Sequence, residues 1–258
     1  MSATEVTWWG HSTVWLADSD TTLLTDPVLT DRVAHLRRMA GPAPRLPAPP
    51  DAVLLSHLHA DHFHLASLRL VPGSPMLIVP RGAASFLAKT LGRPYADRCV
   101  ELSPGSEVTV GGVTVRAVPA AHDGGRGPWS RERADAIGFV VEGRTRTWYG
   151  GDTGLFDEMS GLGPLDLALI PVGGWGPTLA AHGHLDAADG AEALRRVKAA
   201  WAVPVHYGTF WPIGMGRVRP HMFRDPGTRF AEIAARVAPD SRVRVLAQGE
   251  TLAVGHTA

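Results

Sequence analysis

The segment from Ser56 to His62 contains the residues of this chain best suited to chemistry. It places three imidazoles and one carboxylate within six residues: His57, His59, Asp61 and His62. An apolar run at residues 52–55 comes directly before it, which indicates a buried strand that ends in this loop. Imidazole nitrogens and carboxylate oxygens are good ligands for borderline divalent ions. Because the pairs His57/His59 and Asp61/His62 can face two neighbouring points, the segment predicts a site for two metal ions.

Three later residues are candidates for the remaining ligands. His122, Asp152 and His206 each lie just past an apolar or alternating run that predicts a strand. Ligands that follow successive strands converge on one edge of a sheet, where α/β folds place their sites. Each residue alone could instead be a hydrogen-bonded structural residue. Their shared position after strands favours a metal site.

The order and strand context of these seven residues resemble the dinuclear site of the metallo-β-lactamase superfamily. The resemblance implies an α/β fold, the αββα sandwich, that runs nearly from end to end of the chain. It also implies that His57, His59 and His122 hold one ion, that Asp61, His62 and His206 hold the other, and that Asp152 bridges them. Zinc is the expected metal, with manganese or iron as alternatives.

Other motifs are similar to one branch of this superfamily, which contains N-acyl phosphatidylethanolamine phospholipase D and ascorbate-6-phosphate lactonase. They are Trp8-Trp9-Gly10-His11-Ser12, Thr25-Asp26-Pro27-Val28, the proline-rich segment 41–50 and His184-Leu185-Asp186. We expect His184 to donate a hydrogen bond to the transition state or leaving group, although a structural or helix-capping role is the alternative. We expect His11 and Asp26 to orient ligands, with plain turn chemistry as their alternative.

The sequence departs from that branch at His64, where relatives usually carry an acidic residue. If that acidic residue supports a metal or caps the next helix, His64 changes the charge and reach there, which puts the metal preference in question. His182 and His221 have no clear position in the family pattern, and we expect both on the surface or in loops.

Composition limits the class of protein and its partners. The chain has 258 residues, 45% of them hydrophobic, which predicts one domain over residues 1–258 with a sizeable core. The 25 basic and 25 acidic residues cancel, which argues against nucleic acid as a partner. The single Cys99 excludes an intrachain disulfide and fits a reducing compartment. Residues 1–7 do not resemble a secretory signal, and no apolar run approaches the roughly 20 residues of a membrane span, so we expect a soluble cytoplasmic protein.

Strands followed by helices recur twice along the chain, which favours two sheets packed face to face with helices outside. The expected strands are residues 6–9, 13–17, 22–25, 52–55, 76–79, 108–110, 113–118, 137–141, 145–149, 167–171, 202–205 and 243–246. The expected helices are residues 65–70, 83–91, 187–198 and 229–237.

Four segments are expected to form loops around the site: residues 26–50, 120–136, 172–183 and 207–226. They contain or adjoin four aromatic residues and four arginines: Trp129, Trp175, Phe210, Trp211, Arg126, Arg131, Arg217 and Arg219. An aromatic wall with arginines would suit a small, anionic or amphiphilic substrate. The alternative is that the aromatics seal loop packing and the arginines are solvated.

The expected chemistry follows from charge. Two divalent ions with the carboxylates Asp61 and Asp152 leave a net charge of about +2, which lowers the pKa of bound water. The resulting hydroxide could attack an ester-type bond, which predicts a hydrolase with Asp61, Asp152 and His184 as catalytic residues. A phosphodiester is favoured over a lactone because a positive centre and the nearby arginines complement an anionic phosphate. The alternatives are a non-catalytic metal-binding protein that retains the fold, or an iron-dependent redox or thioester enzyme. A homo-oligomer is left open.

Overall fold

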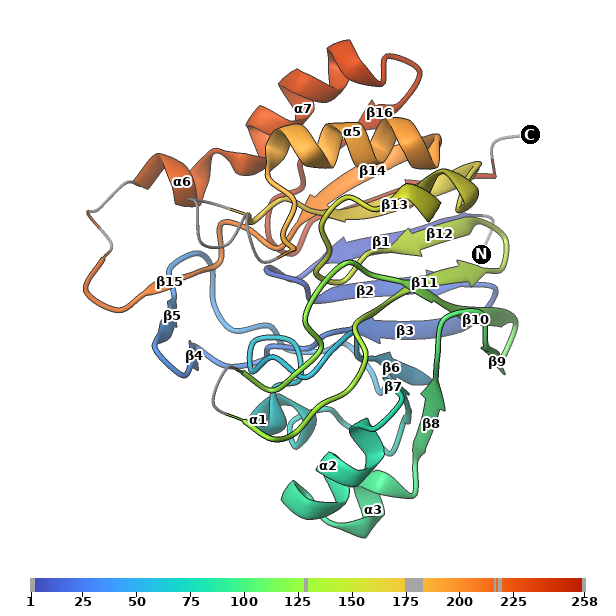
Figure 1. Cartoon of the computed structure of the whole chain (residues 1–258), viewed down its shortest axis with the longest axis vertical. Coiled ribbons are helices and arrows are strands. Elements are labelled where there is room, and N and C mark those ends of the chain that lie inside the picture. Colours follow the sequence, from blue (N-terminus) through green and yellow to red (C-terminus); the bar gives the residue numbers. More distant parts are fainter. Residues whose placement is uncertain (1–2, 128–129, 175–182, 216, 218–219, 257–258) are drawn as a thin grey trace.

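Two seven-stranded sheets lie face to face in the computed structural model of this chain, with helices on both outer faces (Figure 1). The structure describes residues 3–127, 130–174, 183–215, 217 and 220–256. In Figure 1, α5 (Ala187–Val197) and α7 (Pro226–Val237) lie above the strands, whereas α2 (Ala83–Thr90) and α3 (Arg93–Ala96) lie below them. This arrangement confirms the expected αββα sandwich.

The first sheet has the order β17, β1, β2, β3, β6, β7, β8, and the second has the order β16, β14, β13, β12, β11, β10, β9. The strands of the first sheet, in that order, are Thr251–Val254, Thr4–Trp8, Val14–Asp18, Thr21–Thr25, Ala52–Leu54, Met76–Pro80 and Cys99–Leu102. Those of the second are Arg242–Val243, Ala199–Val205, Leu165–Pro171, Arg146–Tyr149, Ile137–Glu142, Val113–Pro119 and Glu107–Val110.

Alternating side chains sort each strand between the core and the helices, as the twofold period of a strand requires. In β12, Tyr149 belongs to the core between the sheets, and its neighbour Trp148 packs with the residues beneath α5. Strand β13 is buried at every residue because it lies between β12 and β14 and is covered on both faces. This explains its continuous apolar run.

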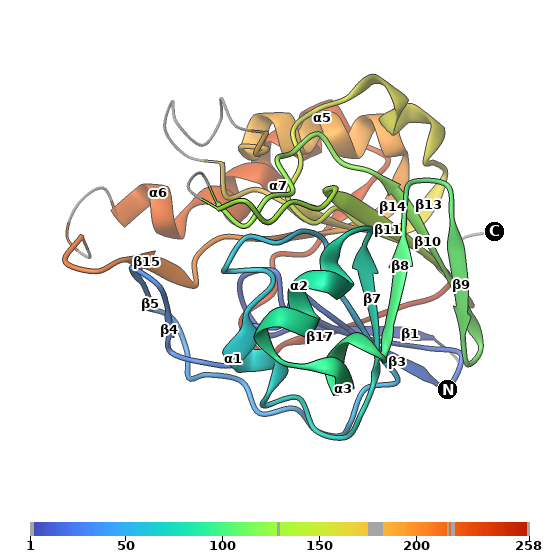
Figure 2. The same cartoon turned by 60° about the horizontal axis from the view of Figure 1, so that its bottom comes forward.

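The helices bury one apolar face each. Helix α5 buries Ala187, Ala191 and Leu194 at helical spacing, and its N-cap residue Asp186 accepts hydrogen bonds from the backbone of Ala188 and Asp189. On the opposite side, α1 (Leu65–Leu68) and α2 cover the first sheet (Figure 2). None of the described helices is long and apolar enough to span a membrane.

Two segments that we expected to be loops instead pair with one another. Residues 26–50 contain β4 (Arg32–Val33) and β5 (Leu36–Arg38), and residues 207–226 contain β15 (Phe210–Pro212) and α6 (Pro220–Arg224). The three strands form a small sheet of order β15, β5, β4. Strands of two or three residues have too little alternation to be recognised, and this pairing joins residues far apart in the sequence. The sequence also did not predict the four-residue strands β8 and β17 at the two edges of the first sheet, nor the short helix α3.

Candidate metal centre

All seven predicted ligands and His184 lie at one edge of the sandwich, where strands of both sheets end. The segment 56–62 follows β6, His122 follows β10, Asp152 follows β12 and His206 follows β14. Strands β3 and β6 are parallel, as are β12, β13 and β14, so their carboxyl ends reach the same edge. The structure therefore brings together every ligand candidate that the sequence predicted.

The first group of potential ligands consists of three imidazoles and a carboxylate: His57, His59, His122 and Asp152. His59 Nδ1 lies 2.9 Å from His57 Nε2 and 3.1 Å from His122 Nε2. Nitrogen atoms around a tetrahedral zinc ion are about 3.3 Å apart, since each lies about 2.0–2.1 Å from the metal. The three nitrogens thus have close to the separations that one bound ion requires.

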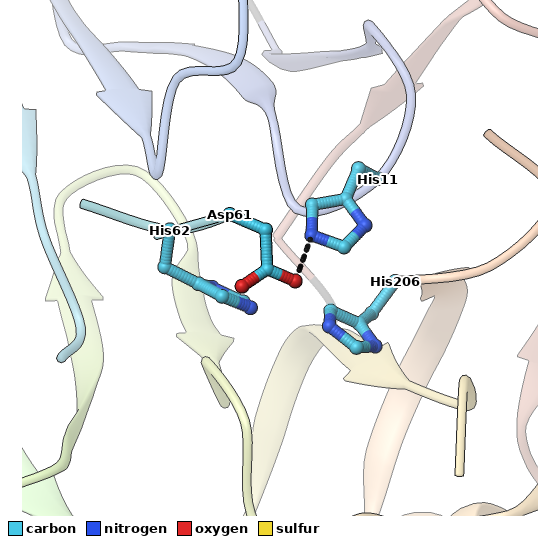
Figure 3. A group of neighbouring side chains, drawn as sticks. All are labelled: His11, Asp61, His62 and His206. Atoms are coloured by element: carbon cyan, nitrogen blue, oxygen red, sulfur yellow. Dashed lines mark ion pairs between the residues drawn. The ribbon is translucent and has the colours of Figure 1, made fainter. Parts of the chain in front are cut away.

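The second group contains Asp61, His62, His206 and, in addition, His11 (Figure 3). Their ligand atoms all lie within 4.8 Å of one another. His11 Nε2 lies 3.2 Å from Asp61 Oδ2. The imidazoles of His11 and His206 are also close, with ring centroids 4.4 Å apart.

Asp152 lies between the two groups. Its Oδ2 atom is 3.1 Å from His62 Nε2 and 3.9 Å from His57 Nε2, and its Oδ1 atom is 3.1 Å from His206 Nε2. The residue is only 3% exposed. One buried carboxylate therefore faces ligands of both groups, as a bridging ligand must.

The outer nitrogens of three histidines have hydrogen-bond partners that orient the rings. His62 Nδ1 donates to Asp26 Oδ2 at 2.7 Å, and His122 Nδ1 donates to the carbonyl of Gly183 at 3.0 Å. His57 Nδ1 lies 2.9 Å from Ser56 Oγ, whose hydroxyl in turn donates to Asp26. Since each Nδ1 then carries a proton, each Nε2 is the nitrogen available to a metal ion.

Asp26 accepts most of the hydrogen bonds in this outer layer, the set of groups that contact the ligand imidazoles from behind. It is completely buried. Besides His62, it accepts hydrogen bonds from the backbone and hydroxyl of Ser56 and from the Tyr149 hydroxyl. The expectation that Asp26 orients ligands agrees with these contacts. Ser56 and Tyr149 were not predicted, although both directly adjoin the predicted ligand motifs.

Burial and charge set the protonation states. Burial lowers the pKa of His59 and of His206 to about 4, and it holds the pKa of His57 well below its ordinary value. Burial raises the pKa of Asp152, but His206 and His62 outweigh it, so that pKa lies well below the ordinary value. Neutral imidazoles beside an ionised carboxylate are the states that metal binding requires.

His62 behaves differently from the other histidines. Burial lowers its pKa, but the carboxylates of Asp152 and Asp26 outweigh burial and hold the pKa well above its ordinary value. A metal ion at His62 Nε2 must therefore displace a proton.

Four buried polar atoms of the centre have no well-aligned hydrogen bond among the described residues: His11 Nε2, His62 Nε2, His206 Nε2 and Asp152 Oδ1. The three nitrogens instead lie 3.1–3.2 Å from a carboxylate oxygen of Asp61 or Asp152. Buried polar atoms normally have partners, so such a cluster needs an explanation. All four are metal-ligand atoms by type. The residues present therefore fit a bound cation.

Comparison with known proteins agrees with this geometry. A family profile described as a Beta-lactamase superfamily domain matches residues 21–207. A metal-dependent hydrolase of Nitratidesulfovibrio vulgaris is 31% identical over 257 residues, which cover 96% of this chain and 95% of that protein. This chain belongs to the metallo-β-lactamase superfamily.

Further relatives place this superfamily member more closely. A Mycobacterium tuberculosis protein is 34% identical over 89% of this chain, but the chain spans only 63% of the length of that relative. An N-acyl-phosphatidylethanolamine-hydrolyzing phospholipase D of Caenorhabditis elegans is 31% identical over 81% of this chain and 64% of its own length. The expected resemblance to that branch of the metallo-β-lactamase superfamily is thus confirmed.

A solved structure shows the same fold over the whole length. Igni18, a metallo hydrolase from the archaeon Ignicoccus hospitalis, has a TM-score of 0.74 and covers 97% of this chain and 98% of its own. The two sequences are 21% identical.

His184 lies beside Asp152 in this candidate metal centre. Its Nε2 atom lies 3.3 Å from Asp152 Oδ2, and its ring centroid is 4.7 Å from that of His122. Because Asp186 caps helix α5, the helix-capping alternative for His184 is wrong. The remaining possibilities for His184 are a structural role or a hydrogen bond to a reacting group near Asp152.

His64 contacts its own helix. Its Nδ1 atom lies 2.7 Å from Ser67 Oγ in α1, and no potential ligand group among the described residues includes it. The departure from the superfamily branch at this position therefore affects the start of a helix and not the metal ligands. Of the two other unassigned histidines, His221 is exposed on α6 as expected, and His182 lies outside the described residues.

The expected wall of aromatic residues and arginines is only partly present. Arg126 is not at the rim, because its guanidinium donates to the carbonyls of Leu58 and Phe63 beneath the metal-ligand loop. Trp211 is buried and donates to the carbonyl of Met215, so it seals loop packing. Phe210 contacts His11 edge-on, with ring centroids 5.6 Å apart.

The remaining rim candidates add little to a binding wall. Arg131 and Arg217 are exposed, whereas Trp129, Trp175 and Arg219 lie outside the described residues. Cys99 packs against the core cluster beneath α2, and burial raises the pKa of its thiol to about 12.

Proposed function

We propose that this protein is a hydrolase that uses two divalent metal ions, with zinc as the best fit, to cleave an ester-type bond. The observation that carries the proposal is a pair of potential ligand groups in which the buried Asp152 belongs to the first group and lies 3.1 Å from His62 and His206 of the second. His57, His59 and His122 would hold one ion, and Asp61, His62 and His206 would hold the other. The metal-dependent hydrolase among its full-length relatives supports the same reaction class.

Two ions bound there would lower the pKa of a water molecule and stabilise negative charge on the reacting oxygen. With all five ligand imidazoles neutral, which requires that His62 give up its proton to the ion, two ions with Asp61 and Asp152 would leave a net charge of about +2. Asp26, Ser56 and the carbonyl of Gly183 keep the imidazole lone pairs directed at the centre. His184, beside Asp152, would donate a hydrogen bond to the reacting group.

A phosphodiester is favoured over a lactone as substrate. An anionic phosphate complements a positively charged centre, and the C. elegans relative is named for hydrolysis of a phospholipid. Arg126, one of the arginines expected to support this preference, does not contribute to it, because its guanidinium is engaged beneath the metal-ligand loop.

Metal analysis joined to a turnover screen tests this function. We expect close to two ions per chain by plasma emission after mild dialysis, and hydrolysis of bis(p-nitrophenyl) phosphate in preference to a simple lactone. Asp152→Ala should lose at least one ion and nearly all turnover, because the two cations would lose their shared carboxylate. The exposed Asp157→Ala serves as the matched control and should retain both.

Three results would contradict the proposal. One ion at full activity would exclude the dinuclear centre, and full turnover by Asp152→Ala would exclude the bridging role. Two ions without turnover on either substrate class would favour the non-catalytic metal-binding alternative.

A further inference from the structure

His11 lies in the turn between β1 and β2 and belongs to the second group of potential ligands, yet it is not one of the seven predicted ligands. It is 5% exposed, and its Nε2 atom approaches Asp61 Oδ2 to 3.2 Å (Figure 3). A buried imidazole aimed at a ligand carboxylate calls for a role beyond turn formation.

The main chain of His11 also contacts the second group. Its carbonyl oxygen accepts a hydrogen bond from the backbone N–H of His206 at 2.9 Å, and another from Trp8 Nε1 at 2.9 Å. The side chain of His11 therefore approaches one predicted ligand of the second ion, while its carbonyl holds the backbone of another.

This conformation is unfavourable for histidine and is held in place by its surroundings. His11 has φ of +51°, in the left-handed region that non-glycine residues seldom adopt. Its backbone N–H donates to Thr209 Oγ1 at 2.7 Å, and the carbonyl of Thr209 accepts from Met39. The β5 and β15 segments thus fix the turn at a position where strain is compensated by hydrogen bonds.

We propose that His11 is a positioning residue of the second metal site, in which its imidazole orients Asp61 and its main chain sets His206. Asp61 has two oxygens, so one can bind the ion while the other accepts from His11. Asp61, His62, His206 and Asp152 already provide four ligands, and a fifth from the protein would leave no open position for a reacting group. The inference rests on the proposed function and assigns a residue to its second ion.

The test measures the affinity of each ion separately, by titrating the metal-free protein with zinc against a chromophoric chelator. His11→Asn keeps the left-handed backbone, which asparagine tolerates, but its side chain is too short to reach Asp61. His11→Gln keeps a donor at nearly the same reach. We expect His11→Asn to weaken the second ion at least 10-fold and leave the first unchanged, in the range found for partners of metal ligands. His11→Gln should recover most of that loss.

Thr209→Val tests the main-chain half of the inference, because it removes the acceptor of the His11 N–H with little change in shape. It should also weaken only the second ion, and Thr209→Ser should restore the affinity. If the His11 variants fold poorly, the comparison of Thr209→Val with Thr209→Ser still tests whether the His11 turn positions the second metal site. The exposed His35→Asn is the matched histidine control and should bind both ions like the wild type.

The outcomes separate this inference from the proposed function. A wild-type protein that binds fewer than two ions would overturn the proposed function itself. Two ions in the wild type with unchanged second-ion affinity in both His11→Asn and Thr209→Val would overturn only the positioning role. A change in the cobalt absorption spectrum of fully loaded His11→Gln would also overturn it, because that change would make His11 a ligand.

Discussion

Seven imidazoles gather at this edge of the protein, whereas two ions with the expected ligand set need only five. The five are His57, His59, His62, His122 and His206, and the additional ones are His11 and His184, which lie beside Asp61 and Asp152 respectively. Each added imidazole thus faces a carboxylate and not the outer layer formed by Asp26. This placement suits roles in orienting a ligand or donating to a reacting group.

His184→Ala tests the second of these roles. If His184 donates to the transition state, kcat should fall by roughly 100-fold or more while metal content and fold remain unchanged, since this is the usual contribution of a positioned acid or base. Steady-state kinetics and metal analysis on the same preparation provide the measurement. Loss of an ion would instead make His184 a ligand or structural support, and a wild-type kcat would remove it from the reaction.

The metal-ligand candidates follow the strands at one end of the sandwich, and at the opposite end hydrogen bonds of Asp18 connect the two sheets. Asp18, at the end of β2, is 2% exposed and accepts hydrogen bonds from Thr4 in the first sheet and from the backbone of Arg144 and Thr145 in the second. This carboxylate therefore joins the two sheets at the ends of β2 and β12 that lie away from the metal centre.

Asp18→Asn should lower the free energy of unfolding by about 2–4 kcal/mol, because an amide cannot accept at both positions and leaves buried donors unpaired. Urea unfolding checks this, with the exposed Asp20→Asn as control. Metal content should not change, because the contact lies far along the strands from the centre. A loss below about 0.5 kcal/mol would contradict the role of Asp18 as a tie.

The same contact predicts the pH dependence of that difference. Burial raises the pKa of Asp18, but hydrogen bonds from Ser19, Thr4 and the backbone outweigh it, so the pKa lies below its ordinary value. Its contribution to stability is then complete at neutral pH and is lost as the pH falls through the folded-state pKa. The difference in the free energy of unfolding between the wild type and Asp18→Asn should accordingly become smaller below about pH 4.

Each of the two ligand groups takes residues from both layers of the sandwich. Residues 57–62 extend from the first sheet, whereas His122, Asp152 and His206 extend from the second. An ion bound there would connect the two sheets, so we expect metal binding to stabilise the fold.

Removing metal with a chelator should lower the stability of the wild type by about 3–4 kcal/mol per ion if free metal had been 100- to 1,000-fold above its Kd. The measurement is urea unfolding with and without chelator at constant pH. Asp152→Ala, which should already lack an ion, should respond less. An equal response of both proteins, or none in the wild type, would show that the ions do not connect the sheets.

The sequence was sufficient to predict the ligand candidates and the layered fold. The string from His57 to His62 is contiguous, and the strand before it is apolar, so both signals are local. His122, Asp152 and His206 were predictable because each directly follows a recognisable strand, and parallel strands bring their carboxyl ends to one edge.

Only the tertiary structure established which atoms face one another. Asp26 accepts hydrogen bonds from Tyr149 and His62, which lie in distant segments of the sequence. The small sheet likewise pairs Arg37 with Trp211. Arg126 lies in a segment that was expected to form a loop at the rim of the site. Its guanidinium instead donates to two carbonyls of the metal-ligand loop and lies beneath that loop. Such contacts depend on how separate elements pack, and sequence spacing specifies which residues follow a strand but not the direction of each side chain.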